Sequence, residues 1–218
     1  MSAARPITTL ISDFGGVLTS PLLRSFAAFQ DEAGVPLEAL GQAMQAIAVR
    51  DGENPLFVLE RGEMSEPAFL TAVGDELEAI LGRPVDMRSF AERYFGSLTA
   101  NDELIEHLRG LRDGGLRLAM LTNNVREWEP RWRAMLPVDE LFELVVDSAF
   151  VGLRKPDRAI YRLTCERLGV APEQCLFLDD LEPNVEAARE LGMAAVQFVD
   201  NAQAIAAMDA LLPAPSAR

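Results

Sequence analysis

Positive charge is scarce in this chain of 218 residues. It carries 20 lysines and arginines against 34 aspartates and glutamates, which gives a net charge of -14. Proteins that bind nucleic acids rely on patches of Lys and Arg, so this balance argues against a nucleic-acid partner. A site for an anionic substrate would therefore need local positive charge, from a metal ion or from a lysine placed within the site.

Cysteine is nearly absent as well: the sequence has two, Cys165 and Cys175, and their spacing fits neither a zinc site nor a redox motif. We expect both to be small apolar residues of the interior, in a reducing compartment. Residues 1–6 contain no apolar signal-peptide core, and no uncharged run approaches the roughly 20 residues of a membrane span. We therefore expect a cytoplasmic protein without a membrane partner. Its oligomeric state stays open, with a homodimer as one option.

Short apolar runs with the composition of buried strands recur along the chain, and helical patterns separate the later ones. The predicted strands cover residues 8–12, 116–121, 144–146, 175–178 and 194–198. The predicted helices cover residues 102–113, 157–168, 183–191 and 202–212. Strands that alternate with helices predict an α/β fold, a three-layer Rossmann-like core with a parallel sheet and helices on both faces.

Residues 20–98 break this alternation, because they contain amphipathic helical patterns and no convincing strand. The patterns cover residues 22–33, 37–49, 67–81 and 87–95. We interpret this stretch as an all-helical cap inserted after the first strand, with residues 1–19 and 99–213 as the core and 214–218 as a loose tail. Such a cap could exclude water and select the substrate; a subdomain that only adds stability is the alternative.

Polar residues follow four of the apolar runs. They are Asp13 with the turn Gly15-Gly16, then Thr122-Asn123-Asn124, then Lys155 within the sequence GLRKPD at 152–157, and Asp179-Asp180. Each cluster alone also fits ordinary turn chemistry. Ligands bind beyond the carboxyl ends of the strands in open parallel sheets, so the clusters are expected to converge there. Together they would supply a nucleophile, hydrogen-bond donors, a cation and metal-binding carboxylates.

In their order and separations these clusters resemble the haloacid dehalogenase-like hydrolase superfamily, over nearly the whole chain. The sequences DFGGVL at 13–18, ERGEMS at 60–65 and VGLRKPD at 151–157 are similar to two groups within it. These are the glucose-1-phosphatase-like members and the phosphatase domain of soluble epoxide hydrolase. The resemblance implies a phosphatase that acts on a small phosphorylated metabolite.

For the catalytic residues, the resemblance implies that Asp13 is the nucleophile and forms an aspartyl-phosphate that water then hydrolyses. Thr122 and the Asn123 amide would hydrogen-bond the phosphoryl oxygens of the substrate. Lys155 would bind the same group and neutralise the charge that phosphate and nucleophile share.

The implied cofactor is Mg²⁺, held by Asp13, Asp179 and the main-chain carbonyl of Gly15. Asp180 would act on the ion indirectly, from behind its direct ligands or through a water, and would be a partner for Lys155. Oxygen ligands around a divalent cation are also what the chemistry requires, because an aspartate and a phosphate repel each other unless positive charge lies between them.

One residue departs from the family pattern: phosphatases of the superfamily usually carry a second aspartate at the position of Gly15. Gly15 keeps the carbonyl and lacks the side chain that would move a proton. Three explanations stay open: a leaving group that needs little protonation, an acid from the cap such as Asp51, Glu60 or Glu63, or a weakly active phosphate-binding or regulatory relative.

A metal-independent 2-haloacid dehalogenase is the alternative enzyme, because those relatives also lack the second aspartate. Asp179-Asp180 argues against it, since two further negative charges beside the nucleophile need a cation to offset them. Arg126 and Arg154 border the clusters and could bind a second anionic group, or they could be solvated. Trp128 and Trp132, one helical turn apart, are expected to pack in the core or at an interface, with shaping of the pocket as the alternative.

Overall fold

The computed structural model describes residues 6–21, 30 and 34–212. The helix predicted over residues 22–33, apart from residue 30, and the tail predicted at 214–218 lie outside the described residues. Within that part of the chain, no helix has both the length and the apolar character needed to cross a membrane.

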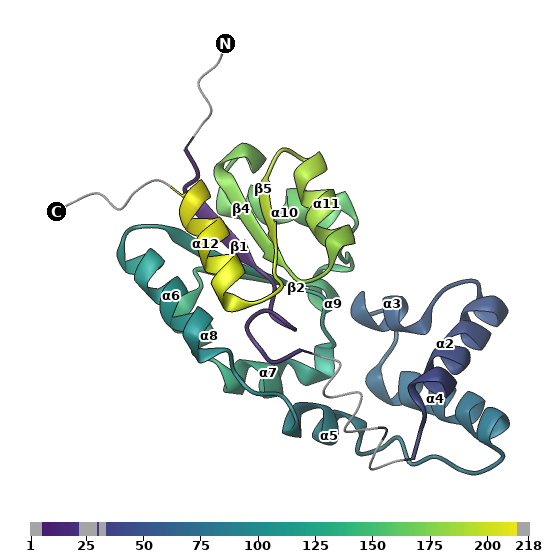
Figure 1. The fold of residues 1–218 in the computed structure, drawn as a ribbon. Helices are drawn as coiled ribbons and strands as arrows, with labels where there is room; N and C mark the ends of the chain where they lie inside the picture. Colours follow the sequence, from purple (N-terminus) through teal and green to yellow (C-terminus); the bar gives the residue numbers. More distant parts are fainter. Residues whose placement is uncertain (1–5, 22–29, 31–33, 213–218) are drawn as a thin grey trace.

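A parallel sheet of five strands forms the centre of the molecule (Figure 1). Its strands are β1 (Thr9–Ser12), β2 (Arg117–Thr122), β3 (Leu144–Asp147), β4 (Cys175–Asp179) and β5 (Ala194–Gln197). They lie in the order β3-β2-β1-β4-β5, and every neighbouring pair is parallel. The predicted Rossmann-like α/β core is confirmed, with each strand found within one residue of its predicted ends. The order places β1 in the middle, with β2 and β4 as its neighbours.

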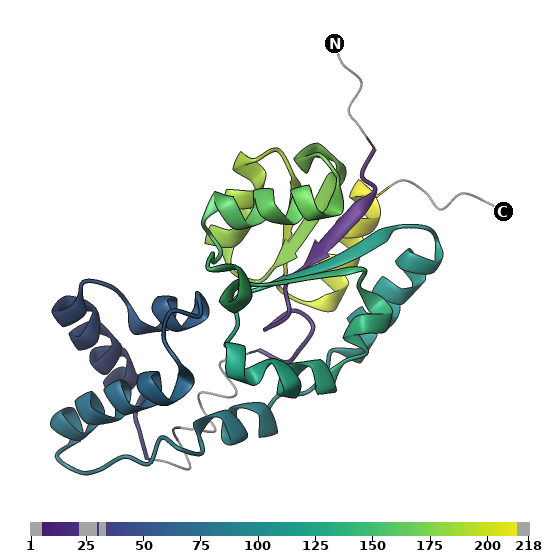
Figure 2. The ribbon, with the colours of Figure 1, turned by 180° about the vertical axis from the view of Figure 1, so that it is seen from behind.

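Helices cover both faces of this sheet, as Figures 1 and 2 show. The core helices are α6 (Asp102–Asp113), α7 (Glu129–Met135), α8 (Val138–Leu141), α9 (Ser148–Val151), α10 (Arg158–Leu168), α11 (Glu182–Glu190) and α12 (Asn201–Leu211), with 3-10 turns η1 (Arg126–Trp128) and η2 (Pro172–Gln174). Leu10 of β1 packs in a cluster with α6 and α12, whereas the next residue, Ile11, packs with α10 and α11. Alternate residues of a strand point to opposite faces, so a strand buried on both sides is apolar throughout.

The inserted region is helical over its described residues and has its own apolar core. It consists of α2 (Leu37–Asp51), α3 (Pro55–Glu60), α4 (Glu66–Leu81) and α5 (Phe90–Gly96), which we call the cap. The sequence pattern placed the start of α5 three residues too early and missed α3 altogether. Six residues are too few for a helical period to be recognised, although Asn54 caps α3 and Pro55 occupies its first turn.

The chain leaves the core for the cap and returns from it at one place. The Ser20 N–H donates to the Thr99 carbonyl at 2.8 Å, and Thr19 forms an antiparallel bridge with Ala100. The Asn101 side chain donates to the Val17 carbonyl at 2.8 Å. These contacts tie the two connecting segments together beside the end of β1, so the cap is inserted next to the carboxyl edge of the sheet.

Candidate active site

The carboxyl ends of β1 and β4 bring Asp13 and Asp179 to the same edge of the sheet. Ser12 pairs with Leu178 in the register of these strands, and the Asp13 N–H donates to the Leu178 carbonyl at 2.8 Å. Asp13 therefore lies beside Asp179, although 166 positions of sequence separate them. Parallel pairing alone produces this neighbourhood, because both strands end at the same level.

A buried lysine joins the two aspartates. The Lys155 Nζ lies 2.7 Å from Asp13 Oδ1 and 2.6 Å from Asp179 Oδ2. Asp179 is fully buried and the Lys155 side chain is 1% exposed, so this ammonium group exchanges its hydration for two carboxylates. Despite burial, the nearby Asp13 and Asp179 charges raise the pKa of Lys155, and the side chain stays charged.

Asp180 contributes to the same cluster, and no ion pair joins it to Lys155 in the described structure. The Lys155 charge still acts on Asp180, because it opposes the rise in pKa that burial and Asp179 cause. Successive residues leave a strand end in different directions, and Asp179 is the residue that points at the ammonium group. Asp13, Asp179 and Asp180 nevertheless each place one carboxylate oxygen so that the three oxygens lie within 4.8 Å of one another.

This carboxylate cluster (Asp13, Asp179 and Asp180) holds more negative charge than Lys155 can offset. Burial raises the pKa of Asp13 to about 7, with Lys155 opposing the shift and Asp179 adding to it. Burial and then the Asp179 charge raise the pKa of Asp180 to about 6. A site with three carboxylate oxygens, no softer ligand and excess negative charge fits a small divalent cation such as Mg²⁺.

Further contacts fix the Asp179 carboxylate. Its Oδ1 accepts hydrogen bonds from the Leu181 N–H and from the Asn184 side chain, both at 2.9 Å, while Oδ2 meets Lys155. The Tyr161 hydroxyl donates to the Asn184 carbonyl at 2.9 Å. Sequence reasoning assigned Asn184 no role. The sequence offered one sign of its importance: Asn184 lies in the first turn of a helix that directly follows the paired carboxylates.

The glycine turn after Asp13 is needed for a specific contact. Gly16 has a φ of +77°, which favours glycine, and a Cβ there would lie 2.5 Å from Asp180 Oδ2. A side chain at this position would displace Asp180 from the carboxylate cluster. The Gly16 N–H also donates to the Thr19 hydroxyl at 3.1 Å, which closes the turn.

The side chain of Asn123, at the end of β2, makes its hydrogen bonds to Lys155 rather than to an open site. Its Nδ2 donates to the Lys155 carbonyl at 3.0 Å, and its Oδ1 accepts from the Lys155 N–H at 2.8 Å. The side-chain amide is therefore committed to the main chain of the loop that carries the lysine. Thr122 ends β2, and its buried hydroxyl has a long contact of 3.5 Å to the Asn123 carbonyl.

The cap meets the core beside Lys155. Arg154 Nε donates to Glu60 Oε2 at 2.7 Å, and its guanidinium lies 3.8 Å from the centre of the Phe57 ring. Arg126 donates to the Ala149 carbonyl. Arg154 is therefore not a solvated surface residue, since its side chain is 18% exposed and paired with the cap. Arg126 is exposed, although its guanidinium keeps this contact with the core main chain.

Tyr94 of α5 belongs to the site surroundings, and sequence reasoning missed it. Burial raises its pKa, and the charges of Asp13 and Glu60 add to that effect. The centroids of the Tyr94 and Trp128 rings lie 5.0 Å apart, so the two rings pack together. An aromatic residue inside an amphipathic helix reads as core, so the pattern carried no sign of this role.

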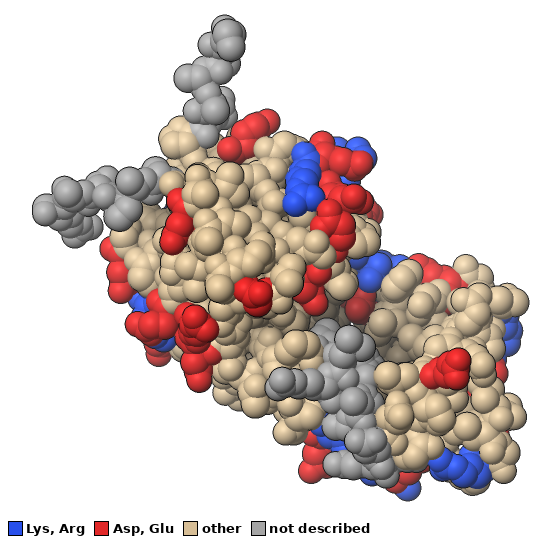
Figure 3. All heavy atoms as spheres, viewed as in Figure 1, with Lys and Arg blue, Asp and Glu red and all other residues tan. Residues whose placement is uncertain are grey.

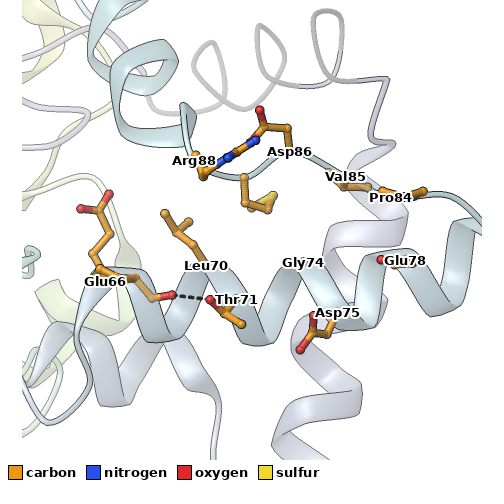
Figure 4. A pocket seen from close by; sticks show the side chains of 12 residues that line it. Glu66, Leu70, Thr71, Gly74, Asp75, Glu78, Pro84, Val85, Asp86 and Arg88 are labelled. Carbon is orange, nitrogen blue, oxygen red and sulfur yellow. Dashed lines mark hydrogen bonds and ion pairs between the residues drawn. The ribbon is translucent and has the colours of Figure 1, made fainter.

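A wide cavity lies elsewhere, on the cap. It has a volume of about 530 Å³ and runs along α4 on the cap, against residues 84–88 (Figure 4). Its lining contains several acidic side chains but none of the strand-end residues. Acidic side chains are also spread over the face of the molecule that Figure 3 shows. The candidate catalytic residues therefore lie at the edge of the sheet, outside this cavity.

Comparison with known proteins places this arrangement in context. The family model of the haloacid dehalogenase-like hydrolases matches residues 7–192. A phosphatase of Mycobacterium tuberculosis is 31% identical over 202 residues, which cover 87% of this chain and 86% of that protein. Mouse acyl-CoA dehydrogenase family member 10 is 29% identical over 222 residues, covering 98% of this chain. Rat bifunctional epoxide hydrolase 2 is 22% identical over 205 residues, covering 88% of this chain.

The chain spans 20% of the mouse protein and 36% of the rat protein. Among solved structures, a HAD-like family hydrolase from Porphyromonas gingivalis has a TM-score of 0.72 at 25% identity, over 95% of this chain and 98% of that one. A HAD family enzyme from Bacteroides thetaiotaomicron, in complex with magnesium and inorganic phosphate, has a TM-score of 0.64 at 22% identity. The match covers 88% of this chain and 93% of that one. An L-2-haloacid dehalogenase has a TM-score of 0.65 at 24% identity, over 88% of this chain and 86% of that one.

Proposed function

The chain belongs to the haloacid dehalogenase-like hydrolases, and on that premise we propose that it is a Mg²⁺-dependent phosphatase acting on a small phosphorylated metabolite. The observation that carries this proposal is the carboxylate cluster with Lys155 between two of its members. The likeness to the Mycobacterium tuberculosis phosphatase over most of both chains supports it.

In the proposed reaction Asp13 supplies the nucleophile. Its carboxylate oxygen attacks phosphorus, the bond from phosphorus to the leaving oxygen breaks, and an aspartyl-phosphate results. Water then attacks the same phosphorus and releases phosphate, which returns Asp13 to its starting form. Phosphoryl transfer needs mainly alignment and stabilisation of charge, so a few well-placed groups are sufficient.

Lys155 holds its ammonium group 2.7 Å from the nucleophile, where it offsets the charge that Asp13 and an incoming phosphate bring together. The Thr122 hydroxyl and the main-chain N–H of Asn123 are the proposed donors to the phosphoryl oxygens. The Asn123 side chain is excluded from that role by its bonds to Lys155. Asp13, Asp179, Asp180 and the Gly15 carbonyl are the proposed Mg²⁺ ligands, and the bound ion would supply the positive charge that the cluster lacks.

Dehalogenation is the second candidate, and two observations favour it: the fold likeness to an L-2-haloacid dehalogenase and the glycine at position 15. At 24% identity that likeness concerns the fold alone. A metal-independent reaction would leave Asp13 beside Asp179 and Asp180 with a single lysine as counter-charge. The Asp179 and Asp180 charges add to the effect of burial in raising the pKa of Asp13, so this arrangement disfavours an ionised nucleophile. We therefore favour the phosphatase.

A phosphate-release screen tests the choice. The protein is assayed against phosphorylated metabolites, sugar 1-phosphates and acyl phosphates first, with Mg²⁺ and with a chelator, and against 2-haloacids in parallel. We expect phosphate release that stops when the chelator is added. Halide release that persists with the chelator would replace the phosphatase by a dehalogenase. Ligand binding without either product would favour a regulatory relative.

We also propose a cytoplasmic location. Cys165 and Cys175 are both free, and their sulfur atoms lie 3.9 Å apart in the interior. Two thiols this close are suited to a reducing compartment. Expression with a fluorescent tag and fractionation of the cells would test the location.

A further inference from the structure

The proposed phosphatase needs a group that moves protons, and Gly15 offers none. When water attacks the aspartyl-phosphate it must lose a proton, and the leaving oxygen of the substrate must gain one. General acid–base assistance typically contributes about 10²–10⁴-fold to such steps. The group has to reach the space beside Asp13, and the cap is inserted next to the end of β1 that carries Asp13.

Of the three acidic cap residues that the sequence nominates, one, Glu60, contacts the core next to Lys155. Asp51 is half exposed and pairs with Arg50 next to it in sequence. Glu63 is likewise half exposed and pairs with Arg61. Glu60, in contrast, is 14% exposed and reaches across to the core.

Glu60 is fixed at the junction of cap and core. It ends α3, and its Oε2 accepts from Arg154 Nε at 2.7 Å. Arg154 directly precedes Lys155, whose ammonium group contacts the nucleophile. Two residues after Glu60, a Cβ on Gly62 would lie 2.2 Å from the carbonyl of Ala149 in α9, so the end of α3 rests directly on the core main chain.

The charged groups around Glu60 link it to the reacting centre. Burial raises the pKa of Glu60, while Arg154 and then Lys155 oppose that shift. Burial raises the pKa of Tyr94 on α5, and the charges of Asp13 and Glu60 both add to that shift. A carboxylate fixed beside Arg154 that holds a proton more strongly than in water is suited to accept one during a reaction.

We propose that Glu60 is the general base of the dephosphorylation step, an assignment that rests on the phosphatase function proposed above. Water oxygen bonds to phosphorus, the bond from phosphorus to the Asp13 oxygen breaks with its electron pair returning to that carboxylate, and the water proton passes to Glu60. In the next turnover Glu60 gives that proton to the leaving oxygen. Arg154 positions the Glu60 carboxylate for both transfers.

Rapid mixing with p-nitrophenyl phosphate in the presence of Mg²⁺ separates the two chemical steps. Its leaving group needs no proton, so the first turnover reports attack by Asp13 and the steady state reports hydrolysis of the aspartyl-phosphate. For Glu60→Gln we expect a nitrophenolate burst at a rate within about twofold of wild type and a steady-state rate lowered about 100-fold. Mass spectrometry of the acid-quenched protein should show phosphorylated Asp13 accumulating in this variant.

Glu63→Gln is the matched control, three residues along the chain and on the surface, and should keep the wild-type rates. Glu60→Asp keeps the carboxylate on a shorter side chain and should recover part of the steady-state rate, and thermal melting checks that each variant folds. If Glu60→Gln slows burst and steady state equally, or changes neither, Glu60 is not the base. A wild-type protein that never forms phosphorylated Asp13 would overturn the phosphatase proposal itself.

Discussion

The side-chain amide of Asn123 holds the main chain of Lys155 at both of its polar atoms, accepting from the N–H and donating to the carbonyl. The peptide groups of Lys155 are thereby fixed to the end of β2, while its ammonium group is fixed by Asp13 and Asp179. A residue that the sequence suggested as a phosphate ligand thus acts, through its side chain, on the placement of the lysine. This relationship leads to the first prediction.

Asn123→Ala should lower kcat in the wild-type background and have almost no further effect on kcat in a Lys155→Met background. The reason is that its side chain acts through Lys155, so the two changes remove one function. We expect each single variant to lose about 100-fold in kcat/KM, because a buried phosphate charge loses its counter-charge. Steady-state kinetics of both single variants and the double variant measure this coupling. Losses that simply multiply would show that the Asn123 side chain contacts the substrate independently.

Asp13→Asn should abolish turnover, by more than about 1,000-fold, with the fold retained. The amide keeps an oxygen for Lys155 but is a poor nucleophile, and removal of a buried negative charge relieves the repulsion within the carboxylate cluster. Phosphate release and far-UV circular dichroism are the measurements. Hydrolysis that survives in well-folded Asp13→Asn protein would end the assignment of Asp13 as nucleophile.

Gly16→Ala and Gly115→Ala separate backbone strain from damage to the carboxylate cluster. Both glycines have positive φ, +77° and +101°, so both variants should lose about 1–2 kcal/mol of unfolding free energy. A Cβ on Gly115 meets open space, whereas one on Gly16 would strike Asp180. Only Gly16→Ala is therefore expected to weaken Mg²⁺ binding and activity, as titration calorimetry and assay would show. Equal activity in the two variants would mean that Asp180 is dispensable.

Asp147 should make stability depend on pH in an unusual direction. Its carboxylate is buried at the end of β3, Oδ1 accepts from the Ala149 N–H, and Oδ2 has no partner among the described residues. Burial raises its pKa from 3.8 to about 6; the Ala149 hydrogen bond opposes the shift, as do the Arg133 and Arg126 charges, while the charge of Glu129 adds to it. A raised folded-state pKa of an acid means that the native state binds the proton more tightly. This contribution to stability is full below about pH 4 and is lost as the pH rises to about 6.

Asp147→Asn, which keeps the capping oxygen and removes the charge, should accordingly be more stable than wild type at pH 8. The gain should reach at most about 3 kcal/mol and shrink toward pH 4. Urea unfolding at both pH values measures it. Asp157→Asn is the control, because Asp157 caps a helix through the same kind of hydrogen bond from an exposed position. A gain for Asp147→Asn that does not change with pH would contradict the prediction.

Trp128 and Trp132 show how much of side-chain packing a local sequence pattern can predict. Trp128 and Trp132 are one helical turn apart, and packing was the expected role for both. Trp132 is fully buried in the sheet core, with its ring 5.7 Å from that of Phe14. Trp128 packs on Tyr94 of the cap and donates its Nε1 to Glu66 at 2.7 Å. The hydrophobic pattern predicted burial correctly, but it carried no information on which of two neighbouring cores each ring would join.

The strands, most of the long helices and the polar residues at the strand tips follow from the sequence, because periodicity, helix caps and strand ends depend on residues close together in the chain. The pairing of these residues does not: Asn123 meets Lys155 across 32 positions, and Glu60 meets Arg154 across 94. Which carboxylates Lys155 would contact, and which cap acid would contact the core, depended on the direction of each side chain and on how the cap rests on the core. Those are properties of packing between distant segments, so only the tertiary structure decided them.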